Sequence, residues 1–264
     1  MHFTKMHGLG NDYLYVYGEV PKNIAELSAK LSERHFGAGS DGIIYISPSD
    51  IADFKMRIFN ADGSEAKMCG NGIRCVGKYV YDKGYTDKTR LKIETLSGIK
   101  YLNLQLSCGK VKYVTVNMGA AIPEKEKTLT VCGKKINCIP VSVGNPHAVI
   151  FVNDIEKAPV LEIGPALEHH KDFPDGVNVE FVQVISEKEM RMRVWERGSG
   201  VTMACGTGAC ASVAAAVSKN ICEREKTISV HLDGGTLKIQ VDYDNNVTMT
   251  GPAETVYEGE TEIC

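Results

Sequence analysis

The amino-acid sequence predicts an α+β protein of two pseudo-symmetric domains, each a mixed, mostly antiparallel sheet curved around a central helix. Three observations support this fold class. Short β-type runs dominate the chain, few segments have helical periodicity, and one ordered set of motifs occurs twice. The length of 264 residues lets each half bury its own core. Because the repeat period far exceeds that of solenoids, we interpret it as duplication of a whole domain.

Four landmarks recur in the same order, at offsets of 134 to 136 residues. They are Gly-Asn, Asp-Gly, Gly-Ser and Cys-Gly-x-Gly, at Gly10-Asn11 and Gly144-Asn145, Asp41-Gly42 and Asp175-Gly176, Gly63-Ser64 and Gly198-Ser199, and Cys69–Gly72 and Cys205–Gly208. A single Cys-Gly-x-Gly would be weak evidence, because cysteine and glycine are common in buried turns. Four landmarks in register indicate two related halves, which we place at residues 1–117 plus 252–264 and at residues 118–251.

Runs rich in β-branched and aromatic residues predict strands throughout both halves. In the first half they are residues 13–17, 43–47, 54–59, 90–94 and 110–116. In the second half they are residues 136–143, 148–152, 177–184, 190–195, 228–232, 237–241 and 247–250. Several runs alternate between apolar and polar residues, as expected for strands with one buried face.

Helices are predicted at three places. Ile24, Leu27 and Leu31 recur with helical spacing after a possible cap at Asn23, so a surface helix should run to about Arg34. A second helix should begin after Cys69, with one apolar face and a stop at Gly84. The third, after Cys205, is small and apolar on every side from Ala209 to Val217, which predicts that it is buried.

Composition narrows the function classes. The hydrophobic content is 43%, the charged content 24% and the formal net charge −3, so neither nucleic acid nor an anionic membrane surface is an expected partner. No apolar run approaches the ~20 residues of a membrane span. The N-terminal residues lack the apolar region of a signal peptide, which predicts a cytoplasmic protein.

Nine cysteines without an export signal favour reduced thiols over disulfides. The pairs Cys69/Cys75 and Cys205/Cys210 invite a zinc interpretation, but their spacing is wider than that of structural zinc sites. Cys75 and Cys210 fall inside the apolar helical runs, so we expect them to be core residues. The remaining cysteines carry no recognisable pattern: Cys108, Cys132, Cys138, Cys222 and Cys264.

Each Cys-Gly-x-Gly motif places a thiol at the start of a helix. The positive end of the helix favours the thiolate and should lower the cysteine pKa, and the first backbone N–H groups can bind a carboxylate. Two such sites facing one substrate would put a sulfur on either face of an amino acid's α-carbon. One thiolate would remove the α-proton and the opposite thiol would deliver another, which inverts the centre.

Two other interpretations account for less of the pattern. Gly206–Ala211 fits G-x-G-x-x-A, but the first half breaks this match and no parallel βαβ unit surrounds either copy. A cysteine hydrolase would pair one cysteine with a histidine such as His147, and would leave the second, symmetric cysteine unexplained.

The segments Asn60–Cys75 and Glu196–Ala209 resemble the two signature regions of diaminopimelate epimerases, and the similarity extends from His7–Asp12 to Gly251–Ala253. This resemblance implies interconversion of LL- and meso-2,6-diaminopimelate in lysine and peptidoglycan precursor synthesis, without pyridoxal phosphate, another cofactor or a metal. It also implies a diaminopimelate-epimerase-like fold with the site in the cleft between the domains, a final segment that packs on the first domain, and a homodimer.

The resemblance also assigns roles by position. Cys69 and Cys205 would be the acid/base thiols, with His147 and Glu196 near the chemistry. The backbone at Gly70-Asn71 and Gly206-Thr207 would hold the reacting carboxylate. The remaining substrate-binding residues would be Asn11, Asn60, Asn145, Asn178, Glu196 and Arg197. A substrate that is zwitterionic at both ends needs an arginine for its distal carboxylate and acceptors for its distal ammonium.

One position departs from the family pattern. Many members carry glutamine where this chain has Gly42, so the side-chain contact of that glutamine is missing here. Two other classes stay open. A related isomerase could act on proline or hydroxyproline, although a small cyclic substrate would not use Glu196 and Arg197 together. A redox protein would cycle a disulfide between Cys69 and Cys205.

Overall fold

The computed structural model describes residues 1–262 and divides the chain into two compact units. The first contains residues 1–116 and the segment that begins at Gly251, and the second contains residues 117–250. Both contain a mixed sheet and few helices, which confirms the predicted α+β class. Cys264 lies outside the described residues.

The first unit begins with a strand pair and ends with a strand from the C-terminal segment. Its elements are β1 (His2–Gly8), β2 (Asn11–Tyr17), α1 (Ile24–Ser32), β3 (Gly42–Ser47), β4 (Phe54–Asn60), β5 (Glu65–Ala66), α2 (Gly70–Asp82), β6 (Arg90–Thr95), β7 (Gly98–Ser107), β8 (Lys110–Ala120) and β19 (Glu254–Glu260). The last residues of β8 already belong to the second unit.

The second unit repeats this order after two short strands. Its elements are β9 (Ile122–Pro123), β10 (Lys127–Val131), β11 (Lys134–Ser142), β12 (Pro146–Phe151), the 3₁₀ helix Ile155–Lys157, α3 (Val160–Glu168), β13 (Asn178–Ser186), β14 (Glu189–Glu196), β15 (Gly200–Val201), α4 (Gly206–Ser218), β16 (Ile228–Leu232), β17 (Gly235–Val241) and β18 (Asn246–Pro252).

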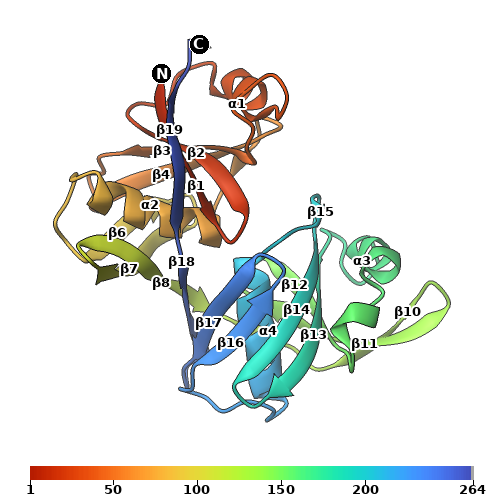
Figure 1. The fold of residues 1–264 in the computed structure, drawn as a ribbon. Helices are drawn as coiled ribbons and strands as arrows, with labels where there is room; N and C mark the ends of the chain where they lie inside the picture. The colour runs from red at the N-terminus through yellow and green to blue at the C-terminus, as the bar shows by residue number, and fades with distance from the viewer. Residues whose placement is uncertain (263–264) are drawn as a thin grey trace. The chain divides into compact units, whose positions relative to one another are not determined.

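The central strands pair in the same way in the two units, as can be followed in Figure 1. β2 pairs with β3 in parallel and β4 with β6 in parallel, and so do β12 with β13 and β14 with β16. The other pairs are antiparallel, for example β3 with β4 and β13 with β14. The prediction of two similar, mostly antiparallel sheets is therefore confirmed element by element.

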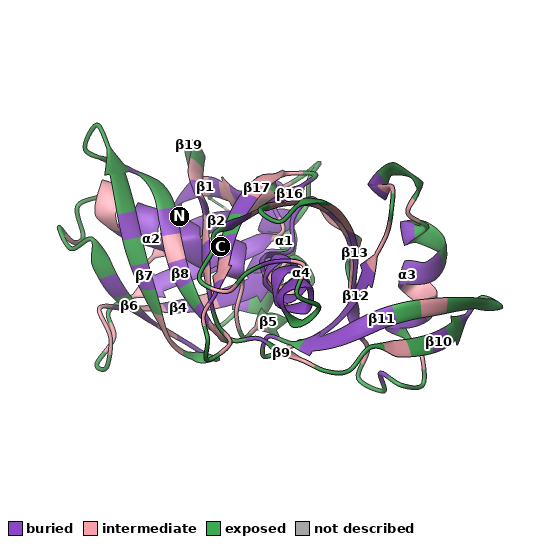
Figure 2. Ribbon diagram, turned by 90° about the horizontal axis from the view of Figure 1, so that it is seen from below, coloured by how far each residue is buried: buried purple, intermediate pink, exposed green. Residues whose placement is uncertain are grey.

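A buried helix lies against the sheet of each unit. α2 packs on β1, β2 and β7, and α4 packs on β11, β12, β13 and β17. Figure 2 shows both helices almost entirely in the colour of buried residues. In α4 every residue from Gly208 to Val217 is buried, as the uniformly apolar sequence predicted. α2 ends at Asp82, and Gly84 follows with a φ of +78°, a conformation that glycine adopts at low cost.

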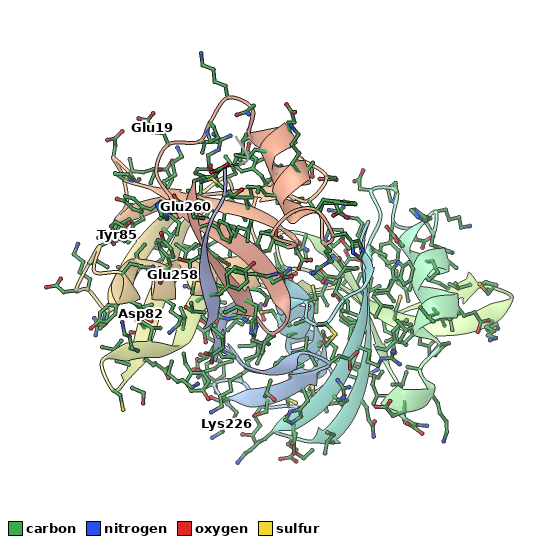
Figure 3. The ribbon with its side chains drawn as sticks, turned by 45° about the horizontal axis from the view of Figure 1, so that its top comes forward. Glu19, Asp82, Tyr85, Lys226, Glu258 and Glu260 are labelled. Atoms are coloured by element: carbon green, nitrogen blue, oxygen red, sulfur yellow. The ribbon has the colours of Figure 1, made fainter. Side chains whose placement is uncertain are left out.

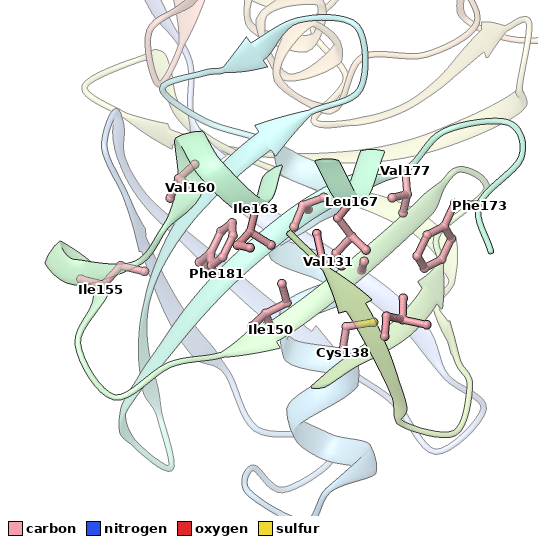
Figure 4. Packing of buried hydrophobic residues seen from close by; sticks show 13 residues of the cluster. Val131, Cys138, Ile150, Ile155, Val160, Ile163, Leu167, Phe173, Val177 and Phe181 are labelled. Atoms are coloured by element: carbon pink, nitrogen blue, oxygen red, sulfur yellow. The ribbon is translucent and has the colours of Figure 1, made fainter. Parts of the chain in front are cut away.

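A second helix in each unit covers a smaller hydrophobic cluster. α1 packs Ile24, Leu27 and Leu31 against β2, β3 and β4, as its spacing predicted, although Asn23 makes no side-chain cap. α3 covers the matching cluster of the second unit, drawn in Figure 4, where Ile163 and Leu167 lie beside Phe181. The sequence did not predict α3, because Gly164 and Pro165 interrupt its apolar pattern.

The C-terminal strand β19 completes the sheet of the first unit. It pairs antiparallel with β1 from His2 to His7. Two ion pairs hold its charged residues: Lys83 Nζ lies 2.5 Å from Glu258 Oε1, and His2 Nε2 lies 3.2 Å from Glu260 Oε1. Figure 3 labels both glutamates along this strand.

The cysteines and helices of the described chain add two observations. The eight cysteines among residues 1–262 are thiols and form no disulfide with one another. Cys75 and Cys210 are 0% exposed, which confirms them as core residues, and burial raises the pKa of Cys75 to about 11. No helix within residues 1–262 is long and apolar enough to cross a membrane.

Candidate active site

Cys69 occupies the N-cap of α2, where the backbone is still extended. The Gly72 N–H donates to Cys69 Sγ over 3.2 Å, so the sulfur takes the place of the usual capping oxygen. The thiol of Cys69 is also 3.2 Å from Asn11 Oδ1, to which it donates. The predicted pair of Cys69 and Asn11 is therefore in direct contact.

A set of hydrogen bonds to Asp41 holds Asn11 in place. The carboxylate of Asp41 accepts from Asn11 Nδ2 at 2.8 Å, from the Asp12 N–H at 3.0 Å and from Arg34 Nη2 at 3.1 Å. The turn before Asn11 places Gly10 at a φ of +87°. The recurring Gly-Asn and Asp-Gly landmarks thus meet in space and orient one amide beside the sulfur.

Two more predicted residues of the first unit lie at the start of the same helix, and Asn60 lies at the end of a strand. Gly70 and Asn71 form the first turn of α2, and both are buried. Arg74 Nη1 donates to Asn71 Oδ1 at 3.0 Å and to the Gly70 carbonyl at 3.2 Å. This arrangement turns the Asn71 amide towards Arg74, in keeping with a role for the backbone of this turn. Asn60 lies at the end of β4, and its Nδ2 donates to Ser64 Oγ over 3.0 Å.

Cys205 occupies the N-cap of α4 but differs from Cys69 in its surroundings. Its residue is only 4% exposed and its side chain makes no capping hydrogen bond. The sulfur lies 3.6 Å from Thr207 Oγ1. Burial, followed by the charges of Glu196 and Glu180, raises the pKa of Cys205 well above its ordinary value. The expectation that the helix end would lower this pKa is wrong here, because desolvation and two carboxylates outweigh the helix dipole.

Glu196 and Arg197 lie at the end of β14, just before the second motif. Desolvation raises the pKa of Glu196, partly offset by hydrogen bonds from Thr202 and Cys205. The Arg197 N–H donates to Asn178 Oδ1 at 3.0 Å, and its guanidinium donates to the Asp175 carbonyl at 2.8 Å. Arg197 as a residue is exposed.

His147 is buried behind Cys205 and links several predicted residues. Its Nε2 lies 3.0 Å from Asn145 Oδ1, and Asn145 Nδ2 donates to Thr207 Oγ1 over 3.3 Å. Its Nδ1 lies 2.7 Å from Glu180 Oε1. The second unit thus brings His147, Asn145 and Thr207 into one chain of hydrogen bonds that ends beside Cys205.

Sequence reasoning missed two buried glutamates that support this site. Glu180 is 0% exposed, and Glu168 accepts from Trp195 Nε1 at 2.7 Å and from the Gly198 N–H at 2.8 Å. Glu168 thereby fixes the turn that follows Arg197. The signal for Glu180 was present in the sequence, because it is the one charged residue in the apolar run from Val177 to Val184.

Gly42 occupies a position where the surrounding backbone leaves no room for a side chain. Its φ is +153°, and a Cβ built on it would lie 2.1 Å from the Phe59 carbonyl oxygen. A glutamine side chain therefore has no room on this backbone, which explains the departure at this position. Among residues 1–262, no three His, Cys, Asp or Glu side chains gather as a metal site.

Comparison with known proteins places the chain among epimerases. A family model described as diaminopimelate epimerase matches residues 3–123 and 139–256. A diaminopimelate epimerase of Acetivibrio thermocellus is 50% identical over 279 residues, covering 100% of this chain and 99% of the relative. One of Methanococcus maripaludis is 51% identical over 280 residues, covering 100% of both chains.

Two solved structures share the fold at low sequence identity. A probable proline racemase of Agrobacterium radiobacter has a TM-score of 0.77 at 16% identity, covering 100% of this chain and 93% of the other. A PhzF-family phenazine biosynthesis protein of Bacillus anthracis has a TM-score of 0.78 at 18% identity, covering 100% of this chain and 99% of the other. At such identities the similarity concerns the fold alone.

Proposed function

Because the chain belongs to the diaminopimelate epimerase family, we propose that it interconverts LL- and meso-2,6-diaminopimelate in lysine and peptidoglycan precursor biosynthesis. The observation that carries the proposal is the duplicated helix start with a cysteine at each N-cap, Cys69 in one unit and Cys205 in the other. A proton acceptor on one face of an α-carbon and a proton donor on the other can invert it, and two thiols supply such a pair.

In the proposed mechanism one sulfur, as thiolate, removes the α-proton while the other, as thiol, protonates the opposite face. Negative charge develops on the reacting carboxylate in the transition state. The first-turn N–H groups at Gly70-Asn71 and Gly206-Thr207 would stabilise that charge, with the positive ends of α2 and α4 behind them. The products leave the two sulfurs with exchanged protonation, ready for the reverse reaction.

The polar residues around the cysteines would select the substrate. Asn11, Asn60, Asn145 and Asn178 would bind its amino and carboxylate groups, with Arg197 on the distal carboxylate and Glu196 near the distal ammonium. Support comes from the exposure of Arg197 and from the hydrogen bond of its backbone N–H to Asn178. His147 would act on Cys205 through its hydrogen bonds to Asn145 and, from there, to Thr207.

We further propose that the two units are the epimerase domains, that the enzyme needs no cofactor, and that it acts as a cytoplasmic homodimer. Activity should therefore depend on reduced thiols alone. Dithiothreitol should restore an air-oxidised sample, and EDTA should have no effect. A working cycle of disulfide formation between Cys69 and Cys205 with an external redox partner would instead favour the redox interpretation.

The test of the substrate is a comparison of amino acids. The purified protein is incubated with LL-diaminopimelate, and meso product is followed by chiral chromatography, with lysine and proline in parallel. We expect turnover of diaminopimelate and almost none of the others, because lysine lacks the distal carboxylate. The Arg197→Met variant should lose about tenfold or more in kcat/KM on diaminopimelate, since a charge-assisted contact is worth ~1.5–3 kcal/mol. Equal use of lysine would overturn the proposed specificity.

A further inference from the structure

A buried carboxylate lies directly behind the second cysteine motif. Glu180 belongs to β13 and its side chain is 0% exposed. Its Oε1 is 2.7 Å from Nδ1 of His147, which is equally buried. A Cβ built on Gly208, in the first turn of α4, would lie 2.7 Å from the same oxygen. The proposed mechanism assigns Glu180 no role.

Such a carboxylate needs electrostatic compensation, because a buried charge without a partner is costly. Its second oxygen, Oε2, has no hydrogen-bond partner within residues 1–262. Compensation must therefore come from His147 at Oε1 and from the positive end of α4, whose first turn lies against the side chain. The other titratable groups around the pair are Glu196 on β14 and Cys205 at the start of α4.

The hydrogen bonds of His147 indicate where its protons lie. Nε2 faces Asn145 Oδ1, an atom that can only accept, so Nε2 carries a proton. Nδ1 faces a carboxylate oxygen, so a second proton lies between Nδ1 and Oε1. Donation from both ring nitrogens would satisfy both acceptors, and this arrangement makes an imidazolium–carboxylate pair of zero net charge.

The imidazolium stands at one end of a directed chain. His147 Nε2 donates to Asn145 Oδ1, and Asn145 Nδ2 donates to Thr207 Oγ1. The Thr207 hydroxyl can complete the chain by donating its proton to Cys205 Sγ, 3.6 Å away. With each of these groups donating towards the sulfur, a positive charge at the far end of the chain favours negative charge on Cys205.

We propose that Glu180 is a positioning residue: it holds His147 as an imidazolium, which polarises the chain through Asn145 and Thr207 towards Cys205 Sγ. This inference rests on the proposed function for its consequence, because it is the thiolate of Cys205 that the chain would stabilise during turnover. Its electrostatic part concerns the enzyme without substrate and can be measured separately.

The experiment combines NMR with kinetics. In protein labelled with ¹⁵N-histidine, the His147 signal is identified by its loss in His147→Gln. At neutral pH we expect both nitrogens of His147 to be protonated in the wild type, and one to be unprotonated in Glu180→Gln. The same variant should lose about ten- to hundredfold in kcat, with a smaller change in KM. This loss is smaller than the ~10²–10⁴-fold loss of rate expected when a whole acid/base group is removed. Glu180→Asp, which keeps the charge, should recover part of both.

The matched control is Ile44→Val. Ile44 lies beneath Gly72 of α2 as Glu180 lies beneath Gly208 of α4, so this variant disturbs packing without touching the pair. It should leave the His147 signals unchanged. An unprotonated nitrogen in the wild type, or a Glu180→Gln enzyme with normal kcat, would overturn the proposal. A wild type that shows the imidazolium but does not turn over diaminopimelate would instead refute the proposed function.

Discussion

The two cysteine sites share a backbone and differ in what lies beneath it. In the first unit Tyr15 pairs with Ile44, and in the second Val149 pairs with Glu180 at the matching place in the sheet. Gly72 and Gly208 are the third residues after the two N-cap cysteines. A Cβ built on Gly72 would lie 2.7 Å from the terminal methyl of Ile44, and a Cβ built on Gly208 would lie 2.7 Å from Oε1 of Glu180. A methyl group in one unit thus corresponds to a carboxylate oxygen in the other.

The difference extends to the sulfurs. Cys69 is partly exposed and caps its helix through the Gly72 N–H, whereas Cys205 is buried and lies near two carboxylates. Both units keep a helix start with a cysteine at its N-cap. The residues behind it diverged, which gives two chemically unequal thiols. An enzyme whose two sulfurs act on stereochemically different hydrogens has no need of equal ones.

The largest effect should come from removing either sulfur. Cys69→Ala and Cys205→Ala should each lower the rate of epimerisation by at least ~10²–10⁴-fold, because each removes one acid/base group. Chiral chromatography of the product measures the rate, and circular dichroism checks that each variant is folded. Near-normal turnover by either would mean that the two halves do not share the chemistry.

The inequality of the sulfurs should appear in their reactivity. Since Glu196 raises the pKa of Cys205, Glu196→Gln should lower it and move the alkylation of Cys205 to lower pH. One pKa unit corresponds to about tenfold in thiolate at a given pH, so we expect an increase of about three- to tenfold at mildly alkaline pH. Peptide mass spectrometry after iodoacetamide treatment gives the rate. An unchanged profile would show that this carboxylate does not govern Cys205.

The residues beneath the two helices should also make glycine-to-alanine variants in the two units differ in unfolding free energy. Gly208→Ala would press on Glu180, which is fixed by His147, whereas Gly72→Ala would press on the terminal methyl of Ile44, which can move. We expect overpacking to cost about 1–3 kcal/mol of unfolding free energy at Gly208, and less at Gly72. Urea denaturation measures both. A larger loss at Gly72 would contradict the comparison.

A second difference in stability concerns the turn before each cysteine. In the second unit the buried Glu168 accepts from Trp195 and Gly198, and Glu168→Ala should cost ~1–3 kcal/mol by leaving those donors unpaired. In the first unit Glu65 makes a partly exposed pair with Arg57, at 2.7 Å, and Glu65→Ala should cost at most ~1 kcal/mol. Equal thermal stability of the two variants would remove this distinction.

Local pattern predicted most of this fold. Alternating and β-branched runs located strands such as Ile228–Leu232, and the uniformly small, apolar segment after Cys205 was correctly expected to be buried. The sequence pattern did not predict the elements that depend on tertiary contacts. α3 contains Gly164 and Pro165 and is helical because its apolar face covers the cluster around Phe181. β19 has no buried core pattern and exists through its pairing with β1.

The site was predictable where it is duplicated and not where it is asymmetric. The repeat pointed to both cysteines and to Asn11 and Asn145. It carried no information on Glu180, whose counterpart is apolar, nor on the raised pKa of Cys205. That pKa depends on burial and on charges from two separate strands, which sequence spacing does not encode.

The most direct test of the two-base account is the isotope pattern of the first turnovers in D₂O. LL-diaminopimelate is incubated with the enzyme, and meso product and recovered substrate are analysed for α-deuterium at low conversion. If Cys69 and Cys205 act on opposite faces, the inverted carbon of the product carries solvent deuterium while the recovered substrate remains protonated. A product that retains the substrate's own hydrogen would show that a single base moves it between the faces, and would contradict the account.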